Sequence, residues 1–257
     1  MRKPFALANW KMSVTIAEGL AFLRALQAAI ADLGNAVDVV ICPPYTALYP
    51  LAQALEDMSA PISLGAQDVH WASDPAYTGE ISAPLLADVG CRWVMLGHWE
   101  RRRHRGEDDD LVQRKLQAAL AAGLRPLLLV GQSSGEADRF QPALAAQLSH
   151  ILAGCDATQV AGMAFVFEPE WSIGVAEPAS PEQVGAGCGF IRRWLAATYG
   201  QAVAEAMRII TGGSVTPQHA AALLAHPDVD GLGATRKGRR AADFAAIVRI
   251  IAENRRP

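Results

Sequence analysis

The sequence predicts a protein of the α/β class, folded as a single (β/α)8 barrel over residues 1–257. Eight short apolar runs recur at roughly even intervals, and a longer stretch with helical spacing of apolar residues follows each of them. A chain of 257 residues with 51% hydrophobic content can bury a large core, and this length suits one barrel better than two small domains. We therefore expect one domain, without a linker or an internal repeat to divide it.

The eight apolar runs are the candidate strands. In chain order they cover residues 5–8, 37–41, 62–66, 93–96, 126–130, 163–167, 207–210 and 231–234. The seventh is the least apolar of the set because Arg208 interrupts it. Alternation of such runs with helical stretches favours a parallel barrel over a β-sandwich.

Capping and stop signals mark several helices between these strands. Thr15 and Glu18 have the spacing of a capping box, and Gly34 supplies a stop after the apolar face that follows them. Ser82 and Thr216 each stand ahead of a proline near the first helical position, so each is expected to start a further helix. These signals predict helices where a barrel needs them, between one strand and the next.

Composition and charge exclude several classes of function. A net charge of −3 and a pI near 6.1 argue against a nucleic-acid partner, although residues 101–103 and 236–240 are locally basic. The four cysteines lie far apart, without the spacing of a zinc site or a disulfide framework. We therefore expect reduced thiols and no bound metal.

No segment has the pattern of a signal peptide or a membrane span. Only apolar residues 5–8 follow the basic start, which is too short for a signal h-region, and no run of 18 apolar residues occurs elsewhere. We therefore expect a cytoplasmic protein with no membrane partner.

Three of the apolar runs end in polar side chains of the kinds used in catalysis. Asn9 and Lys11 follow the first run, His98 and Glu100 follow the fourth, and Glu168 follows the sixth. Parallel strands in a barrel all point the same way, so these side chains should converge at its carboxyl-terminal mouth. We expect a candidate active site there.

The motifs around these residues resemble those of the triosephosphate isomerase family. Asn9 and Lys11 match its N-x-K motif, and residues 97–102 match G-H-S-E-R-R at every place except Trp99. Residues 168–174 match E-P-x-W-x-I-G. Further segments agree in order and spacing, at residues 42–45, 65–68, 78–82 and 212–215, so the resemblance covers nearly the whole chain.

The resemblance implies a TIM barrel and an isomerase of glycolysis and gluconeogenesis that uses neither a metal nor an organic cofactor. Its small-molecule substrate would be a sugar phosphate, with dihydroxyacetone phosphate and glyceraldehyde 3-phosphate interconverted through an enediolate. Residues 74–79 are similar to the family's interdigitating loop. This similarity implies a homodimer in which Thr78 reaches toward the Lys11 region of the other subunit.

The same resemblance implies a role for each polar residue at the mouth. Glu168 would be the base that moves a proton between adjacent carbons, and His98 would be the electrophile that stabilises the enediolate oxygen. His98 immediately precedes a predicted helix, whose N-terminus disfavours imidazolium, so we expect a neutral ring. Lys11 would hold the substrate's negative charge, with Glu100 as its ion partner and Asn9 as a hydrogen-bond donor beside it.

The expected phosphate-binding site resembles that of the family in two of its three segments. Gly174 in the lid and Ser214 after the seventh strand are suited to present backbone N–H groups to an anion. The third part departs, because the family's Gly-Gly after the eighth strand falls on Thr235 and Arg236. Arg236 brings a guanidinium suited to phosphate. It is interpreted either as a replacement anchor or, together with Trp99, as a reshaping of the pocket for a longer substrate.

Other departures lie around the same mouth. Trp99 replaces the serine of G-H-S-E, Val175 and Ala176 replace Thr-Gly in the lid, and Gln132 replaces a glutamate after the fifth strand. Thr211 replaces a tyrosine that helps to hold the closed lid, which puts that latch in doubt. Glu170 replaces an apolar hinge residue and would raise the pKa of a carboxyl if it faces Glu168.

Three interpretations of function stay open at this point. The leading one is an isomerase of three-carbon sugar phosphates. The second is an isomerase of a four-carbon ketose phosphate, because some family members in tetritol catabolism resemble this chain at residues 70–72, at 178–180 and at Arg236. The third is a non-catalytic anion-binding or regulatory protein that kept the scaffold, and the intact base and electrophile argue against it.

Overall fold

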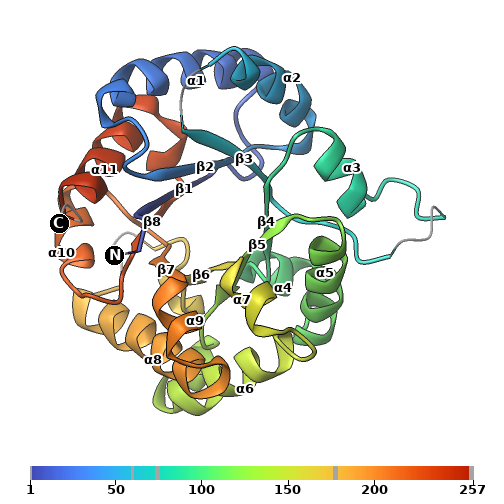
Figure 1. Ribbon diagram of the computed structural model, residues 1–257, viewed down its shortest axis with the longest axis vertical. Coiled ribbons are helices and arrows are strands. Elements are labelled where there is room, and N and C mark those ends of the chain that lie inside the picture. The colour runs from blue at the N-terminus through green and yellow to red at the C-terminus, as the bar shows by residue number, and fades with distance from the viewer. Residues whose placement is uncertain (1, 59–60, 73–75, 176–178, 255–257) are drawn as a thin grey trace.

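Eight parallel strands form a closed barrel, with a ring of helices around it (Figure 1). The computed structural model describes residues 2–58, 61–72, 76–175 and 179–254. The strands follow one another in chain order, and β1 closes the sheet by pairing with both β2 and β8. The predicted (β/α)8 barrel is therefore confirmed.

The strands are short and start and end near the predicted places. They are β1 (Phe5–Asn9), β2 (Asp38–Cys42), β3 (Ile62–Ala66), β4 (Trp93–Leu96), β5 (Arg125–Val130), β6 (Ala164–Phe167), β7 (Arg208–Thr211) and β8 (Gly231–Ala234). The third, fourth and eighth coincide with the predicted ranges. The second and seventh are displaced by one residue, because sheet pairing continues to Cys42 and Thr211.

The helices and helical turns alternate with the strands. They are α1 (Ile16–Ile30), η1 (Ala31–Leu33), α2 (Tyr45–Glu56), α3 (Ala83–Asp88), α4 (Trp99–Arg105), α5 (Asp109–Ala121), η2 (Ser134–Arg139), α6 (Phe140–Ile151), α7 (Ala157–Ala161), η3 (Glu170–Ser172), α8 (Pro181–Tyr199), α9 (Gln201–Ala206), α10 (Pro217–Leu224), η4 (Lys237–Arg239) and α11 (Ala241–Asn254).

The predicted capping signals act at the helix ends. Thr15 Oγ1 accepts the N–H of Glu18, and the Glu18 carboxylate accepts the N–H of Thr15 at 2.7 Å, which completes the capping box of α1. Gly34 adopts a positive φ of 53° after the turn that follows α1. Ser82 and Thr216 precede α3 and α10, but neither side chain makes a capping hydrogen bond. Each helix instead has a proline in its first two positions, Pro84 in α3 and Pro217 in α10.

The core has two layers that the barrel wall separates. Side chains inside the barrel form one cluster: Phe5, Leu7, Val40, Cys42, Trp93, Met95, Leu127, Leu129, Ala164, Val166 and Ile210. A larger cluster fills the space between the strands and the surrounding helices. All four cysteines are buried and free. None of the described helices is long and apolar enough to span a membrane.

Candidate active site

The carboxyl-terminal mouth of the barrel gathers the residues that the sequence singled out. An inner hollow is lined in part by Asn9, His98, Glu168 and Thr235. An adjoining hollow of about 220 Å³ is lined by Lys11, Glu168, Ile173, Gly174, Gly213, Ser214, Thr235, Arg236 and Arg239. The two hollows share Glu168, Gly213 and Thr235. Eight of the nine predicted site residues therefore line one continuous region, and the ninth, Glu100, reaches it through Lys11.

Lys11 holds an unusual backbone conformation at the end of β1. Its φ is 51°, in a left-handed region that side chains other than glycine rarely adopt. Two hydrogen bonds stabilise it: Asn9 Oδ1 accepts the Lys11 N–H at 2.9 Å, and Gln67 Nε2 donates to the Lys11 carbonyl at 2.8 Å. Asn9 thus fixes the lysine's main chain, a contribution that the sequence did not predict.

The ammonium of Lys11 forms an ion pair with the Glu100 carboxylate. Partial burial opposes ionisation of Glu100, but the Lys11 hydrogen bond and neighbouring positive charge outweigh it, and the Glu100 pKa lies below its ordinary value. The pair was predicted, and the structure places it as expected. It connects the end of β1 with the first turn of α4 and holds the lysine at the pocket wall.

His98 caps the N-terminus of α4 with its own ring. Its Nδ1 accepts the main-chain N–H of Glu100 at 3.1 Å, which leaves the ring proton on Nε2. Burial holds the His98 pKa below its ordinary value, and the positive charge of Lys11 acts in the same direction, while the Glu168 carboxylate opposes both. The ring is therefore neutral, with a donor N–H available for an oxygen atom in the pocket.

The Glu168 carboxylate is buried at the end of β6 and faces the His98 ring. Its Oε2 lies 3.8 Å from His98 Nε2, too far for a direct hydrogen bond. Among the described residues, this buried oxygen has no hydrogen-bond partner. A β-carbon at position 212 would lie 2.8 Å from Glu168 Oε1, so Gly212 makes the room in which the carboxylate lies. An unpartnered buried carboxylate oxygen is costly unless another molecule uses it.

Trp99 forms a hydrogen bond with the main chain of Glu168 and does not line the pocket. Its indole Nε1 donates to the Glu168 carbonyl at 2.9 Å, and Arg102 lies over its ring at 5.3 Å. The described lining of the two hollows does not include Trp99. The interpretation that Trp99 reshapes the pocket is therefore not supported, because its indole N–H joins the start of α4 to the main chain at the end of β6.

Glu170 does not face Glu168, so the condition for a raised carboxyl pKa is not met. The Glu170 carboxylate accepts a hydrogen bond from the main-chain N–H of Ser134 at 2.8 Å and another from Arg103 Nε at 2.7 Å. The hydrogen bond from Ser134 and then that from Arg103 hold the Glu170 pKa below its ordinary value. Glu170 therefore connects η3 to α4 and to the loop after β5.

The phosphate end of the pocket carries contacts to the lid. Ser214 Oγ donates to the Val175 carbonyl at 2.5 Å, and Arg236 donates to the same carbonyl at 2.9 Å. Arg236 also lies 3.3 Å from Ser214 Oγ. Gly174 has a positive φ of 76°, which its lack of a side chain permits. Arg236 thus lies beside the predicted anion position and, together with Ser214, binds the lid.

Of the remaining substituted residues at the rim, one makes a local hydrogen bond and another has a side-chain oxygen without a partner. Thr211 Oγ1 donates to the Phe167 carbonyl at 3.1 Å inside the sheet, so its hydroxyl is turned away from the lid. Gln132 Oε1 is buried and has no hydrogen-bond partner among the described residues. Three predictions fall partly outside the described residues: the lid substitution at 176, position 178 of the segment 178–180, and positions 74–75 of the loop 74–79.

One pocket residue escaped prediction. Arg239 lines the outer hollow and donates to Ser13 Oγ at 2.7 Å. Of the locally basic residues 236–240, the sequence singled out only Arg236, yet Arg236 and Arg239, at the two ends of the η4 turn, line the same hollow. Their spacing of three residues, one turn of a 3₁₀ helix, was the available signal. The described residues hold no cluster of His, Cys, Asp and Glu suited to a metal ion.

The mouth of this closed parallel barrel holds a buried carboxylate opposite a neutral imidazole, and a basic hollow under a lid lies next to them. These features define the class of barrel enzymes that move protons on small anionic molecules. Comparisons with known proteins narrow this class. The family model described as triosephosphate isomerase matches residues 4–251. The chain belongs to the triosephosphate isomerase family.

Curated relatives and a solved structure agree over the whole length. The chain is 43% identical to a triosephosphate isomerase of Herpetosiphon aurantiacus, covering 97% of this chain and 100% of that protein. It is 39% identical to a triosephosphate isomerase of Carboxydothermus hydrogenoformans, covering 97% and 99%. The crystal structure of triosephosphate isomerase from Bartonella henselae superposes with a TM-score of 0.83 at 32% identity, covering 96% and 98%.

Proposed function

We infer that the chain is an aldose-ketose isomerase that interconverts dihydroxyacetone phosphate and glyceraldehyde 3-phosphate. Its relatives at 43% and 39% identity carry the name triosephosphate isomerase over their full lengths. The observation that carries the inference in this chain is the buried Glu168 Oε2, which has no partner among the described residues and lies 3.8 Å from the N–H of a neutral His98. A base and an electrophile face each other there, as this reaction requires.

We propose that Glu168 and His98 divide the proton chemistry. Glu168 removes a proton from C1 of dihydroxyacetone phosphate, the C–H electron pair forms a C1–C2 double bond, and the carbonyl pair moves onto the C2 oxygen to give the enediolate. The proton of the C1 hydroxyl is transferred to the C2 oxygen, and Glu168 returns its proton to C2, which leaves the aldehyde at C1. The neutral His98 ring donates its Nε2 hydrogen bond to the oxygen that gains charge, which is the established pattern of this family. The Lys11 ammonium lies at the same wall and attracts the negative charge that develops.

The substrate phosphate is proposed to bind in the outer hollow. Main-chain N–H groups at Gly174 and Ser214 are suited to its oxygens, and the Arg236 guanidinium adds a charged donor. A phosphate that takes the Arg236 and Ser214 donors would release the Val175 carbonyl from both side chains. Substrate binding would therefore be coupled to a rearrangement of the lid.

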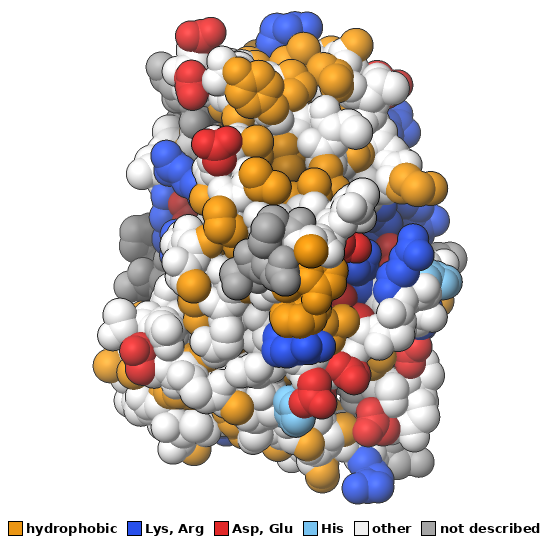
Figure 2. Space-filling view, turned by 90° about the vertical axis from the view of Figure 1, so that its right-hand side faces the viewer, with side chains coloured by type: hydrophobic (Ala, Val, Ile, Leu, Met, Phe, Trp, Pro, Cys, Tyr) orange, Lys and Arg blue, Asp and Glu red, His pale blue; other side chains and the backbone are white. Residues whose placement is uncertain are grey.

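A homodimer is proposed as the active assembly. Large hydrophobic side chains are exposed on neighbouring segments of the chain: Met12, Tyr45, Tyr49, Tyr77 and Leu85. Figure 2 shows hydrophobic side chains over much of the face that carries α3 and the segment before it. An extended patch of this kind indicates a protein interface. Covering it with a second copy would bring Thr78 toward the region of Lys11 in the partner subunit.

A coupled assay with two substrates tests the function directly. The purified protein is offered glyceraldehyde 3-phosphate and a tetrulose phosphate in parallel, and kcat/KM is measured for each, because discrimination between substrates lies in that ratio. We expect the triose phosphate to give the larger kcat/KM. A larger value for the tetrulose phosphate would favour the four-carbon interpretation, and the absence of turnover on both would favour the non-catalytic one. No observation on the described residues favours either alternative.

A further inference from the structure

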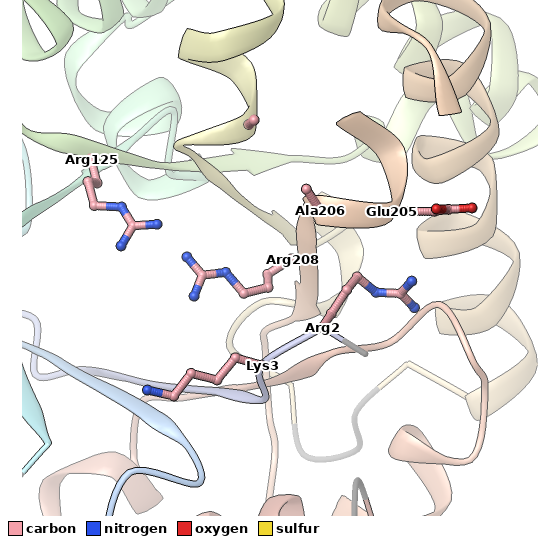
Figure 3. Close-up of a pocket in the computed structure, with 7 residues that line it drawn as sticks. Arg2, Lys3, Arg125, Glu205, Ala206 and Arg208 are labelled. Carbon is pink, nitrogen blue, oxygen red and sulfur yellow. The ribbon is translucent and has the colours of Figure 1, made fainter. Parts of the chain in front are cut away.

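A basic pocket lies at the amino-terminal end of the barrel, opposite the candidate active site. Its volume is about 550 Å³, and its lining residues are Arg2, Lys3, Arg125, Ala161, Glu205, Ala206 and Arg208. Arg125 and Arg208 are the first residues of β5 and β7, and Arg2 and Lys3 lie just before β1. The start of three parallel strands thus places four cationic side chains around one space. Figure 3 shows the guanidinium groups of Arg125 and Arg208 pointing toward one another across it.

Arg125 lacks a counter-ion. Within the described residues, no carboxylate lies within ion-pair distance of its guanidinium, whose Nε donates instead to the Gly162 carbonyl at 3.0 Å. The group also stacks over the Trp93 ring at 4.1 Å. Burial and then the nearby charge of Arg208 hold the Arg125 pKa below its ordinary value, while the Asp38 carboxylate, beyond ion-pair distance, opposes both. The pocket therefore contains a positive charge that the chain does not neutralise.

The other three cationic side chains of the pocket share two carboxylates, which do not neutralise the positive charge of the pocket. Asp38 pairs with both Lys3, at 2.6 Å, and Arg208. Asp230 pairs with Arg2 at 2.6 Å, but it also pairs with Arg192 outside the pocket. The only acidic residue in the described lining is Glu205, which accepts a hydrogen bond from Gln201 and points away from the two facing guanidinium groups in Figure 3. The excess positive charge remains beside Arg125 and Arg208.

The two facing guanidinium groups are held in place before any ligand arrives. Arg208 lies over the rings of Phe5 and Trp93, at 5.2 Å and 5.4 Å, and Arg125 lies over Trp93 as well. The planar fork of a guanidinium matches the oxygens of a phosphate group, and an immobilised fork loses little entropy on binding. The pocket volume also falls in the range of roughly 300–1,000 Å³ typical of small-molecule sites.

We propose that this pocket is a second anion site, which binds a small molecule carrying two phosphate groups. Arg125 offers its unpaired guanidinium to one phosphate group, and Arg208, whose Nη1 pairs with Asp38, offers its remaining N–H donors to the other. Lys3, which shares Asp38, adds a third cation at the edge. The site lies at the opposite end of the barrel from the hollow assigned to the substrate phosphate, so the two sites are separate. A nucleoside diphosphate and a sugar bisphosphate share the required chemistry, and they differ in the spacing of their phosphates.

Binding of inorganic pyrophosphate, measured by isothermal titration calorimetry at low ionic strength, tests the site. We expect Arg125→Gln to weaken binding by at least about tenfold, the usual loss for one charge-assisted contact. Arg24→Gln removes the same charge from an exposed position of α1 and should bind as the unaltered chain does. Adenosine diphosphate and a hexose bisphosphate, titrated in the same way, distinguish linked from separated phosphates.

Glu205→Gln is expected to increase the affinity of the pocket for pyrophosphate. A misfolded variant would not show such an increase. Removing this negative charge from the pocket wall should tighten pyrophosphate binding by about twofold or more. The isomerase kcat and KM should stay unchanged in Arg125→Gln and Glu205→Gln, because neither residue belongs to the active site. Equal pyrophosphate affinity in the unaltered chain, Arg125→Gln and Glu205→Gln would overturn the proposal, since any binding would then lie elsewhere.

Discussion

The indole N–H of Trp99 donates to the main-chain carbonyl of Glu168 over 2.9 Å. This hydrogen bond joins the first residue of α4 to the end of β6, and so ties the segment that carries His98 to the residue that carries the proposed base. A β-carbon at position 131 would approach the same carbonyl to 2.5 Å, so Gly131 leaves the space that the close packing needs. We therefore assign Trp99 a positioning role.

Trp99→Phe should lower kcat and leave KM nearly unchanged. Phenylalanine keeps an aromatic ring of smaller volume and lacks the indole N–H, so the expected decrease is about three- to tenfold, for a hydrogen bond worth ~1 kcal/mol. Trp194→Phe, which alters a tryptophan that packs against Tyr199 on the far end of α8, is the matched control and should keep full activity. Steady-state kinetics of both variants would contradict the assignment if Trp99→Phe raised KM while kcat stayed constant.

Arg236→Gly should raise KM for every sugar phosphate tested. The guanidinium lies in the outer hollow beside Ser214 and Val175, so its loss removes a charged donor worth about 1.5 kcal/mol or more, a factor of about ten in affinity. Arg240→Gly, which removes a more exposed arginine of the same basic run, should change KM little. Both variants are measured with triose and tetrulose phosphates.

The ratio between the two substrates separates the interpretations of Arg236. An equal rise in KM for both supports the phosphate anchor, whereas a changed ratio of kcat/KM values would support a pocket shaped for the longer substrate. An unchanged KM together with an unchanged ratio would show that neither interpretation holds.

The His98 ring should stay neutral where an ordinary histidine is half protonated. Burial lowers its pKa, so the ring remains uncharged as the pH falls through about 6.5, the usual value. The unfolded chain binds a proton there that the folded chain does not, so this residue's contribution to stability is full above about pH 6.5 and decreases below it. Nitrogen NMR of labelled histidine at about pH 6.5 should report His98 as mainly neutral, with its proton on Nε2. An imidazolium signal from His98 above about pH 6.5 would contradict this prediction.

Sedimentation at micromolar protein should report a homodimer. Thr78→Arg places a charge in the exposed segment that is proposed to meet the partner, so it should shift the protein toward monomer and lower its activity. Thr158→Arg adds the same charge at an exposed position of α7 and should leave both properties unchanged. A fully active monomer would exclude the proposed dependence of the site on the second subunit.

The residues at the ends of strands were the part of the site that the sequence could predict. Asn9, His98 and Glu168 follow apolar runs, and parallel pairing brings the ends of such runs together whatever the details of packing. The Lys11 pair with Glu100 also formed as expected. These predictions needed only the fold and the order of the motifs.

Side-chain direction was the part that the sequence could not predict. Glu170 lies two residues from Glu168, but the Glu170 carboxylate accepts a hydrogen bond from Arg103 on another segment. Trp99 follows His98 directly, yet its indole N–H donates to the main-chain carbonyl of Glu168. Both outcomes depend on partners that are distant in sequence, at separations of 67 and 69 residues. A pattern of neighbouring residues carries no information about them.

Turnover of Glu168→Gln tests the central claim, that the unpartnered carboxylate opposite His98 is the base of an isomerase. The substitution keeps the shape of the side chain and removes the charge that accepts the proton. The base acts in the transition state more than in the ground state, so kcat should fall much more than KM changes. Glu182→Gln, at an exposed position of α8, is the control and should keep full activity.

The coupled assay with glyceraldehyde 3-phosphate gives both constants in one experiment. We expect kcat of Glu168→Gln to fall by about 10² to 10⁴, the usual contribution of a positioned base, with Glu168→Asp also strongly impaired because its carboxylate is one methylene short. A Glu168→Gln variant that kept more than about a tenth of the original kcat, well above that range, would contradict the account.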